Sequence, residues 1–121
     1  VHTGGDGYPS LFVSNGSDRA ISTGNVDVQE DRWNHFASVY SYGEYLESYS
    51  NGKRDVRTLT DLKVIPTNSR LTLGRRKGWH NYAEVSMDEV CIFNRTLKKK
   101  EINMIYRAGK EGFGEKGCEL E

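Results

Sequence analysis

Residues 32–40 read RWNHFASVY, and residues 46–53 read LESYSNGK. The dipeptide Asn51-Gly52 separates two short runs, Tyr45–Ser50 and Asp55–Leu59. Asn and Gly tolerate the positive φ angles of the tight turns that join twisted antiparallel strands. This stretch therefore predicts a β-hairpin, with a further strand over Trp33–Tyr40 just before it.

The rest of the chain repeats this texture of short apolar runs broken by Gly, Asn, Asp and Ser. A second Asn-Gly pair, Asn15-Gly16, predicts a hairpin between Leu11–Ser14 and Arg19–Ser22. Further strands are expected at Leu71–Leu73 and Val85–Phe93. The longer of the two needs a β-bulge near Asp88-Glu89 to bring its apolar residues onto one face.

One segment has helical spacing. Within Leu97–Ala108, the apolar residues Ile102, Ile105 and Tyr106 recur on one helix face, and Gly109 is expected to end the helix. The prediction is an all-β domain over residues 1–109 with one short C-terminal helix. A tail over residues 110–121 follows, which Cys118 could tie back to the domain.

Charge and hydropathy exclude two classes of function. The 121 residues include 17 basic and 17 acidic side chains, so the formal net charge is zero. A nucleic-acid binder that acts through bulk counterion release needs a basic excess, so we expect no nucleic acid among the partners. The mean hydropathy is −0.72, and no run approaches the ~18 apolar residues of a membrane span. We expect no membrane insertion.

The two cysteines, Cys91 and Cys118, lie too far apart for a zinc site. A disulfide between them would fix the C-terminal tail to the domain. Two glycosylation triplets begin at Asn15 and Asn94, and with the cysteine pair they favour a secreted or extracellular setting. The alternative is an intracellular chain with two inert thiols.

Four segments in a fixed order carry a resemblance to a known family: residues 32–40, 46–53, 71–74 and 87–97, the last followed by Glu101-Ile102 and Ile105-Tyr106. Together they resemble the laminin G-like domains of the concanavalin A-like lectin and glucanase superfamily. The resemblance implies a two-sheet antiparallel jelly-roll sandwich that binds glycans or proteins outside cells, often with calcium. It also implies that other chains or missing strands complete the sandwich. The family pattern makes Asn15 the expected glycosylation acceptor, because the amide at Asn94 commonly serves the backbone. It places Trp33 and Tyr49 in the core.

Because the superfamily includes glycosidases, paired carboxylates need a test. Retaining cleavage requires two carboxyl groups about 5 Å apart. Glu84 and Asp88 on one strand would stand about 13 Å apart, and Asp88 and Glu89 would point to opposite faces. Ser86 stands where a middle acid would be needed. The sequence predicts no enzyme.

The segment from Gly74 to Tyr82 combines basic and aromatic side chains between two expected strands, in a position where loops carry function. Aromatic faces stack on sugar rings, and Arg and Lys hold sulfate or carboxylate groups. The expected ligand-binding residues are Arg75, Arg76, Lys77, Trp79, His80 and Tyr82. The alternative is that Trp79 plugs the end of the sandwich and the basic residues are only solvated.

Two further expectations concern charged groups. Calcium is the one cofactor implied, and Asp88 is its candidate ligand by family position. Lys98, Lys99 and Lys100 could extend a basic patch or form a solvated turn, and Thr96 is the nearby residue expected to cap the helix. The function predicted is a non-catalytic extracellular recognition module that binds a glycan. The alternatives are a structural or protein-interaction module in a surface assembly, or an accessory domain of a hydrolase.

Overall fold

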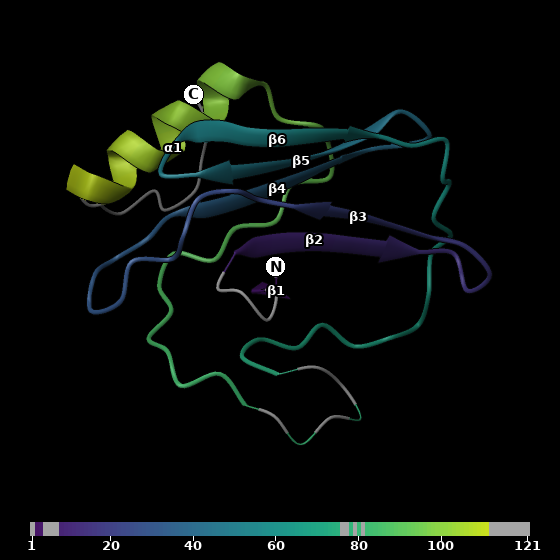
Figure 1. Cartoon of the computed structure of the whole chain (residues 1–121), viewed down its shortest axis with the longest axis horizontal. Helices are drawn as coiled ribbons and strands as arrows, with labels where there is room; N and C mark the ends of the chain where they lie inside the picture. The colour runs from purple at the N-terminus through teal and green to yellow at the C-terminus, as the bar shows by residue number, and fades with distance from the viewer. Residues whose placement is uncertain (1, 4–7, 76–77, 79, 81, 112–121) are drawn as a thin grey trace.

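The computed structural model describes residues 2–3, 8–75, 78, 80 and 82–111. These residues form two antiparallel sheets of three strands each and one helix (Figure 1). The first sheet contains β1 (His2–Thr3), β2 (Pro9–Ser14) and β3 (Arg19–Thr23), and the second contains β4 (Phe36–Ser41), β5 (Tyr45–Ser50) and β6 (Lys53–Leu59). The helix α1 spans Lys99–Glu111. The mainly β class, with two antiparallel sheets and one short helix, is confirmed.

Both predicted Asn-Gly hairpins form. Between β5 and β6, Asn51 and Gly52 have φ angles of 50° and 78°, the two positive values of a type I′ turn. Between β2 and β3 the loop is longer, and Gly16 has φ of 96°. There the Asn15 Oδ1 accepts hydrogen bonds from the backbone N–H groups of Ser17 and Asp18. The Asn15 side chain and a backbone bond from Asn15 N–H to the Asp18 oxygen therefore close the β2–β3 turn, while Ser50 pairs with Lys53 across the β5–β6 turn.

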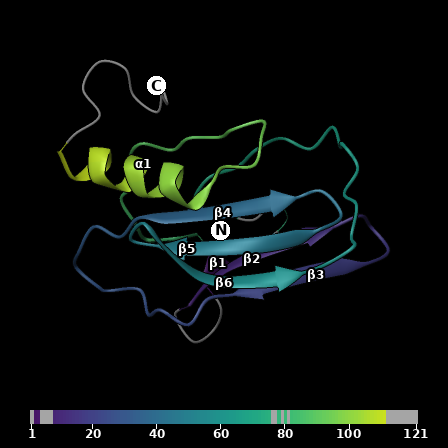
Figure 2. The same ribbon diagram turned by 90° about the horizontal axis from the view of Figure 1, so that it is seen from above.

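The second sheet, β4–β6, is the central layer of the domain. The helix lies over one of its faces and the first sheet lies against the other, so the domain has three layers (Figures 1 and 2). On the helix side, Val39 and Tyr49 pack with Ile102 as an apolar core. On the other side, the buried Ser22 and Ser48 face one another between the sheets, with their hydroxyl oxygens 3.5 Å apart. The apolar cluster of Val39, Tyr49 and Ile102 therefore lies between a sheet and the helix, while Leu46, 0% exposed, is buried on the opposite face of β5.

Of the two residues that were predicted to lie in the core, one is buried and the other is exposed. Tyr49 is 1% exposed, which confirms its prediction, but Trp33 is 74% exposed, and its placement in the core is wrong. The strand expected from Trp33 begins only at Phe36. The cause is local, because the Asn34 side chain bonds the backbone of Gln29 and Arg32 and holds residues 29–34 in a closed loop.

The strands expected at Leu71–Leu73 and Val85–Phe93 are wrong. Among the described residues between β6 and α1, the pairing is limited to an isolated bridge between Arg75 and Tyr82. Glu89 has a φ angle of 54°, so the backbone does turn where a bulge was expected, but without a strand. An apolar alternating run cannot form a strand without a second backbone to take its N–H and C=O groups.

The helix begins and ends two or three residues later than predicted. Thr96 does not cap it. Instead, the Glu101 carboxylate accepts the backbone N–H of Lys98 at 2.7 Å and pairs with Arg95 at 2.8 Å. The Arg95 guanidinium, and then the Lys98 amide, lower the pKa of Glu101 to about 2. The expected stop at Gly109 is also wrong, since the helix continues to Glu111. No helix in the described part of the chain is long and apolar enough to span a membrane.

Candidate functional site

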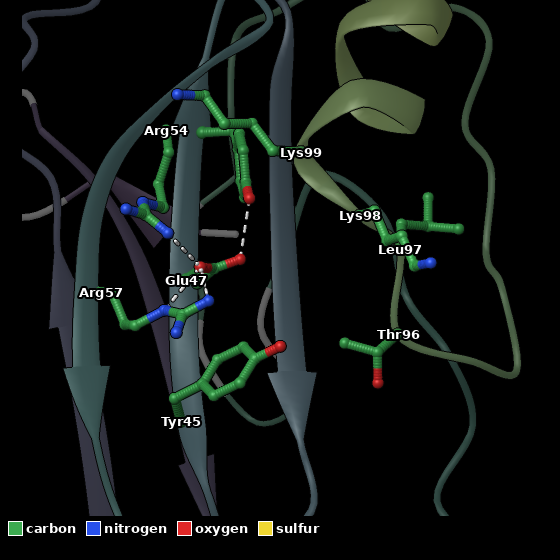
Figure 3. Close-up of a pocket in the computed structure, with 9 residues that line it drawn as sticks. Tyr45, Glu47, Arg54, Arg57, Thr96, Leu97, Lys98 and Lys99 are labelled. Carbon is green, nitrogen blue, oxygen red and sulfur yellow. Dashed lines mark hydrogen bonds and ion pairs between the residues drawn. The ribbon is translucent and has the colours of Figure 1, made fainter.

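A cavity of about 340 Å³ opens on the helix side of the central sheet, between the β5–β6 hairpin and the start of α1 (Figure 3). Its walls come from the hairpin on one side and from the segment before and at the helix start on the other. The lining residues are Tyr45, Glu47, Tyr49, Arg54, Arg57, Thr96, Leu97, Lys98 and Lys99. We call this cavity the Glu47 pocket.

Glu47 is the centre of the pocket and is only 2% exposed. Its Oε1 accepts hydrogen bonds from Arg54 Nη1 at 3.0 Å and from Arg57 Nε at 2.7 Å. Arg57 Nη2 also lies 2.6 Å from this oxygen. The hydroxyl of Tyr49 donates to the other oxygen, Oε2, at 2.8 Å. Both carboxylate oxygens are therefore satisfied, as a buried charge requires.

This network keeps Glu47 ionised. Burial alone would raise its pKa, but the hydrogen bonds from Tyr49, Arg57 and Arg54 outweigh burial and hold the pKa below its ordinary value. The pKa of Tyr49 moves up, first because the phenol is buried and then because it donates to Glu47. The tyrosine stays protonated and the glutamate stays charged, so neither group is ready to exchange a proton near neutral pH.

The two arginines are half exposed and face outward from this anchor. Each has 41% of its side chain accessible, while Glu47 has 3%. The guanidinium carbon of Arg57 also lies 4.0 Å from the centre of the Tyr45 ring, in cation–π geometry. Lys98 and Lys99 add two exposed ammonium groups from the helix start. Four cations against one carboxylate leave the pocket with a net charge of +3.

A shift in strand register brings both arginines to this face. Glu47 pairs with Arg57, and Tyr49 pairs with Arg54, with an irregularity between Ser48 and Tyr49. Residues three apart on a regular strand point to opposite faces, so Arg54 and Arg57 could not otherwise meet one carboxylate. The extra residue is Asp55, whose carboxylate accepts the backbone N–H groups of Asn25 and Val26.

The loop predicted to bind ligand is only partly described. Arg76, Lys77 and Trp79 lie outside the described residues. Arg75 and Tyr82 are brought together, since Arg75 Nη1 donates to the Tyr82 hydroxyl at 3.4 Å and the guanidinium carbon lies 5.8 Å from the ring centre. Tyr82 and His80 are both exposed. The binding role of this loop stays a prediction.

Comparison with known proteins gives the family. Residues 1–103 match the sequence model of a laminin G family described as the concanavalin A-like lectin/glucanases superfamily. The chain belongs to this laminin G-like family. A search of the curated proteins finds no match.

A solved structure shares the fold of this laminin G-like domain. It is the 2.1 Å crystal structure of an S-layer domain-containing protein from Clostridium thermocellum ATCC 27405, with a TM-score of 0.59 and 22% sequence identity. The match covers 73% of this chain and 45% of that chain, so the domain spans less than half of the neighbour. At this identity the likeness shows the fold alone.

Calcium stays an expectation for the laminin G-like domain. Asp88 is exposed, and its Oδ1 accepts the backbone N–H of Glu89 at 2.8 Å. No group of three or more His, Cys, Asp or Glu side chains suited to a metal gathers among residues 2–3, 8–75, 78, 80 and 82–111. The structure therefore gives Asp88 a local role at a turn.

The modification sites also stay predictions. Asn15 already uses its Oδ1 in the β2–β3 turn, whereas Asn94 is exposed in a bend after residue 93. The Asn94 amide was expected to bond the backbone, and in the structure it is the Asn15 amide that does so. Cys118 lies outside the described residues, so its disulfide with Cys91 is untested.

Sequence reasoning missed the Glu47 pocket. Glu47 lies in residues 46–53, one of the segments that carry the family resemblance, and Arg54 and Arg57 follow it closely. Arg54 and Arg57 are three residues apart, so a regular strand would place them on opposite faces. The period-two alternation of Tyr45, Glu47 and Tyr49 was the available signal, because it places a carboxylate between two aromatic rings on one face. The sequence offered Lys98 and Lys99 only as an extension of a basic patch at the loop of residues 74–82 or as part of a solvated turn, and the structure places them at the pocket with Arg54 and Arg57.

Proposed function

We propose that this laminin G-like domain is a non-catalytic extracellular recognition module that binds glycans carrying acidic groups through the Glu47 pocket. The observation that carries the proposal is the positively charged cavity, in which a buried carboxylate holds two arginines in place. Membership of a superfamily of lectins and glucanases supports a sugar as the ligand. The S-layer domain-containing neighbour supports a surface setting.

The pocket offers donors that the protein does not use. Glu47 engages one nitrogen of Arg54 and two of Arg57, and each guanidinium carries five N–H donors. A carboxylate or sulfate group on a sugar accepts two such bonds from one guanidinium. Because Glu47 fixes the arginines before a ligand arrives, less side-chain entropy is lost on binding. Glu47 is thus a positioning residue, and the arginines contact the ligand.

The same geometry supports a module without catalysis. A glycosidase needs one carboxyl group with a raised pKa as general acid and a second carboxylate nearby. Among the described residues, Glu47 is the one carboxylate that lines the pocket, its pKa is lowered, and both of its oxygens are bonded. Such a group neither donates a proton nor attacks a sugar at neutral pH.

Calorimetric titration tests the binding proposal. We expect oligogalacturonate to bind the domain and an uncharged oligosaccharide of equal length to bind the pocket at least about tenfold more weakly. Arg57→Ala should weaken oligogalacturonate binding by about tenfold or more, and raised salt should weaken it further. Arg19→Ala is the matched control, because Arg19 is an exposed arginine on the first sheet.

The same titration separates the alternatives. Arg75→Ala tests the loop around Tyr82, and repeats with and without calcium test the expected cofactor. If Arg19→Ala weakens oligogalacturonate binding as much as Arg57→Ala does, the affinity depends only on the overall charge of the domain, and binding in the Glu47 pocket is contradicted. If the domain binds no acidic glycan but binds a surface protein tightly, the structural or protein-interaction module is favoured. Cleavage of oligogalacturonate would contradict the non-catalytic assignment.

The expected completing strands also remain part of this proposal. Val85, Met87, Val90 and Ile92 are all exposed, in the segment that the family pattern makes a strand. Pairing of this segment with a strand from elsewhere in the protein or from another chain would bury these side chains and satisfy the backbone.

A further inference from the structure

The connection between β3 and β4, residues 24–35, holds a large aromatic side chain in solvent. Trp33 lies in this connection and is 74% exposed, although Trp is a highly buried residue on average. The connection projects from one end of the sheets in both views (Figures 1 and 2). Trp33 does not line the Glu47 pocket, so its exposure is a separate feature of the domain.

The loop that carries Trp33 is held in a defined shape. The side-chain amide of Asn34 donates to the backbone oxygens of Gln29 at 2.7 Å and Arg32 at 2.9 Å. Its Oδ1 accepts the backbone N–H of Gln29 at 3.3 Å. Asp31 has a φ angle of 54°, a left-handed conformation that Asp adopts more readily than most residues other than Gly. Trp33 therefore stands on an ordered loop.

Both ends of the connection are fastened to the β5–β6 hairpin. The Asp55 carboxylate accepts the N–H groups of Asn25 at 2.7 Å and Val26 at 3.1 Å. At the other end, the Asn51 side chain accepts the N–H of His35 at 3.0 Å, and the Asn51 N–H donates to the His35 oxygen at 2.8 Å. These bonds fix where the loop leaves and rejoins the sheet, so the exposed indole stands on a loop that is attached at both ends, and less ordering is needed on binding.

The neighbours of Trp33 narrow the ligand class. Glu30, Asp31 and Arg32 are all exposed. The centre of a protein interface is depleted of charged residues and needs a wider apolar patch than one ring. A pyranose ring fits better, because its C–H face stacks on an indole while its hydroxyl groups bond charged and amide side chains. One aromatic ring among polar groups is what such an amphipathic ligand requires.

We propose that Trp33 is the stacking platform of a second glycan site, one that takes a neutral pyranose ring. This site rests on the recognition function proposed above, but not on the Glu47 pocket. The indole face binds the sugar, and Asn34 acts as a positioning residue that holds the loop.

Intrinsic fluorescence tests the platform directly. The chain contains two Trp residues, so Trp79→Phe leaves Trp33 as the single indole reporter. We expect a saturable change in its emission on titration with at least one of cellohexaose, xylohexaose and chitohexaose. In calorimetry, Trp33→Ala should weaken binding of that oligosaccharide at least about tenfold. Asn34→Ala should weaken it by roughly threefold, because the loop then pays an ordering cost on binding.

Two control variants make the test specific. Tyr42→Ala removes another exposed aromatic ring, in the β4–β5 turn, and should leave the affinity unchanged. Arg57→Ala should weaken oligogalacturonate binding without affecting the neutral oligosaccharide. Flat Trp33 emission with all three neutral oligosaccharides would overturn the platform, as would an equal loss in Tyr42→Ala. If a neutral oligosaccharide binds in a Trp33-dependent way while Arg57→Ala leaves oligogalacturonate affinity unchanged, the Glu47 pocket is contradicted and the Trp33 platform is supported.

Discussion

Two regions of this laminin G-like domain carry similar short apolar runs and fold differently. Residues 36–59 form three paired strands in which Leu46 and Tyr49 are buried, whereas the described residues of 61–98 form no strand and leave Val85 and Ile92 more than half exposed. β5 has a hydrogen-bonded neighbour on each side. The difference teaches that an apolar alternation becomes a strand only when a second backbone pairs with it.

Amide hydrogen exchange should show the largest contrast between the regions. The amides of β5 lie in the centre of a sheet and should exchange only through global unfolding, at least about a thousandfold more slowly than unprotected amides. The amides of Val90 and Ile92, outside any strand, should exchange close to the unprotected rate. Equal protection in both regions would contradict the comparison. Protection at Val90 that arises only in a longer chain or with a partner would support the completing strand.

Matched isoleucine substitutions should give the next largest effect. Ile102→Ala removes a side chain that is 1% exposed and packs on Val39 and Tyr49, so it should lower the free energy of unfolding by about 2–5 kcal/mol. Ile92→Ala removes a side chain that is 73% exposed and should change it by less than about 0.5 kcal/mol. Urea unfolding of both variants measures the difference, and similar losses would show that residues 85–93 pack in solution.

A pair of glycine substitutions sharpens the comparison at nearly identical backbone angles. Gly52 and Gly78 have φ of 78° and 79°, so alanine is strained at both positions. At Gly52 a Cβ would also lie 2.5 Å from Cδ1 of Tyr106 on α1, while at Gly78 it would meet nothing within 4 Å. Both substitutions should cost about 1 kcal/mol of backbone strain, and Gly52→Ala should cost up to about 3 kcal/mol in total. Equal melting temperatures for the two variants would be incompatible with the packing of Tyr106 on this turn.

The smallest expected effect is a pH dependence that belongs to His35. Its ring lies 5.6 Å from that of Tyr106, its Nδ1 is buried without a partner, and burial lowers its pKa below the ordinary 6.5. The unfolded chain then binds more protons than the folded domain as the pH falls through 6.5, so the domain should lose stability as the pH is lowered through this value. The lowered pKa values of Glu47 and Glu101 place their own losses at lower pH, below 4.5. His35→Gln should remove the dependence above pH 5, and His80→Gln, at an exposed position, should keep it.

Much of the fold could be predicted from local chemistry. The Asn51-Gly52 pair sets both positive φ angles of the β5–β6 turn, and the spacing of Ile102, Ile105 and Tyr106 makes one helix face apolar. Both of these predictions depend on residues close together in the sequence. The burial of Tyr49 was expected instead from its place in the family pattern, and it is confirmed.

The failed predictions depend on what lies across the fold. The strand at residues 85–93 failed because its pairing partner is not a sequence neighbour, and Trp33 failed because Asn34 bonds the loop before the strand can begin. The arginines of the pocket could not be paired with Glu47 from the turn alone. A regular two-residue hairpin would set Val56 opposite Glu47, and only the extra residue at Asp55 brings Arg57 there.

The sequence by itself determined where the chain turns, which residues make one helix face apolar, and the family to which the domain belongs. Those features follow from the φ angles that single residues tolerate and from the period of the side chains. Only the tertiary structure decided that Val39, Tyr49 and Ile102 form an apolar cluster beneath α1, that Glu47 anchors two arginines, and that Trp33 faces water. Burial and ion pairing depend on groups distant in the chain, whose approach is fixed by how sheets and helix stack.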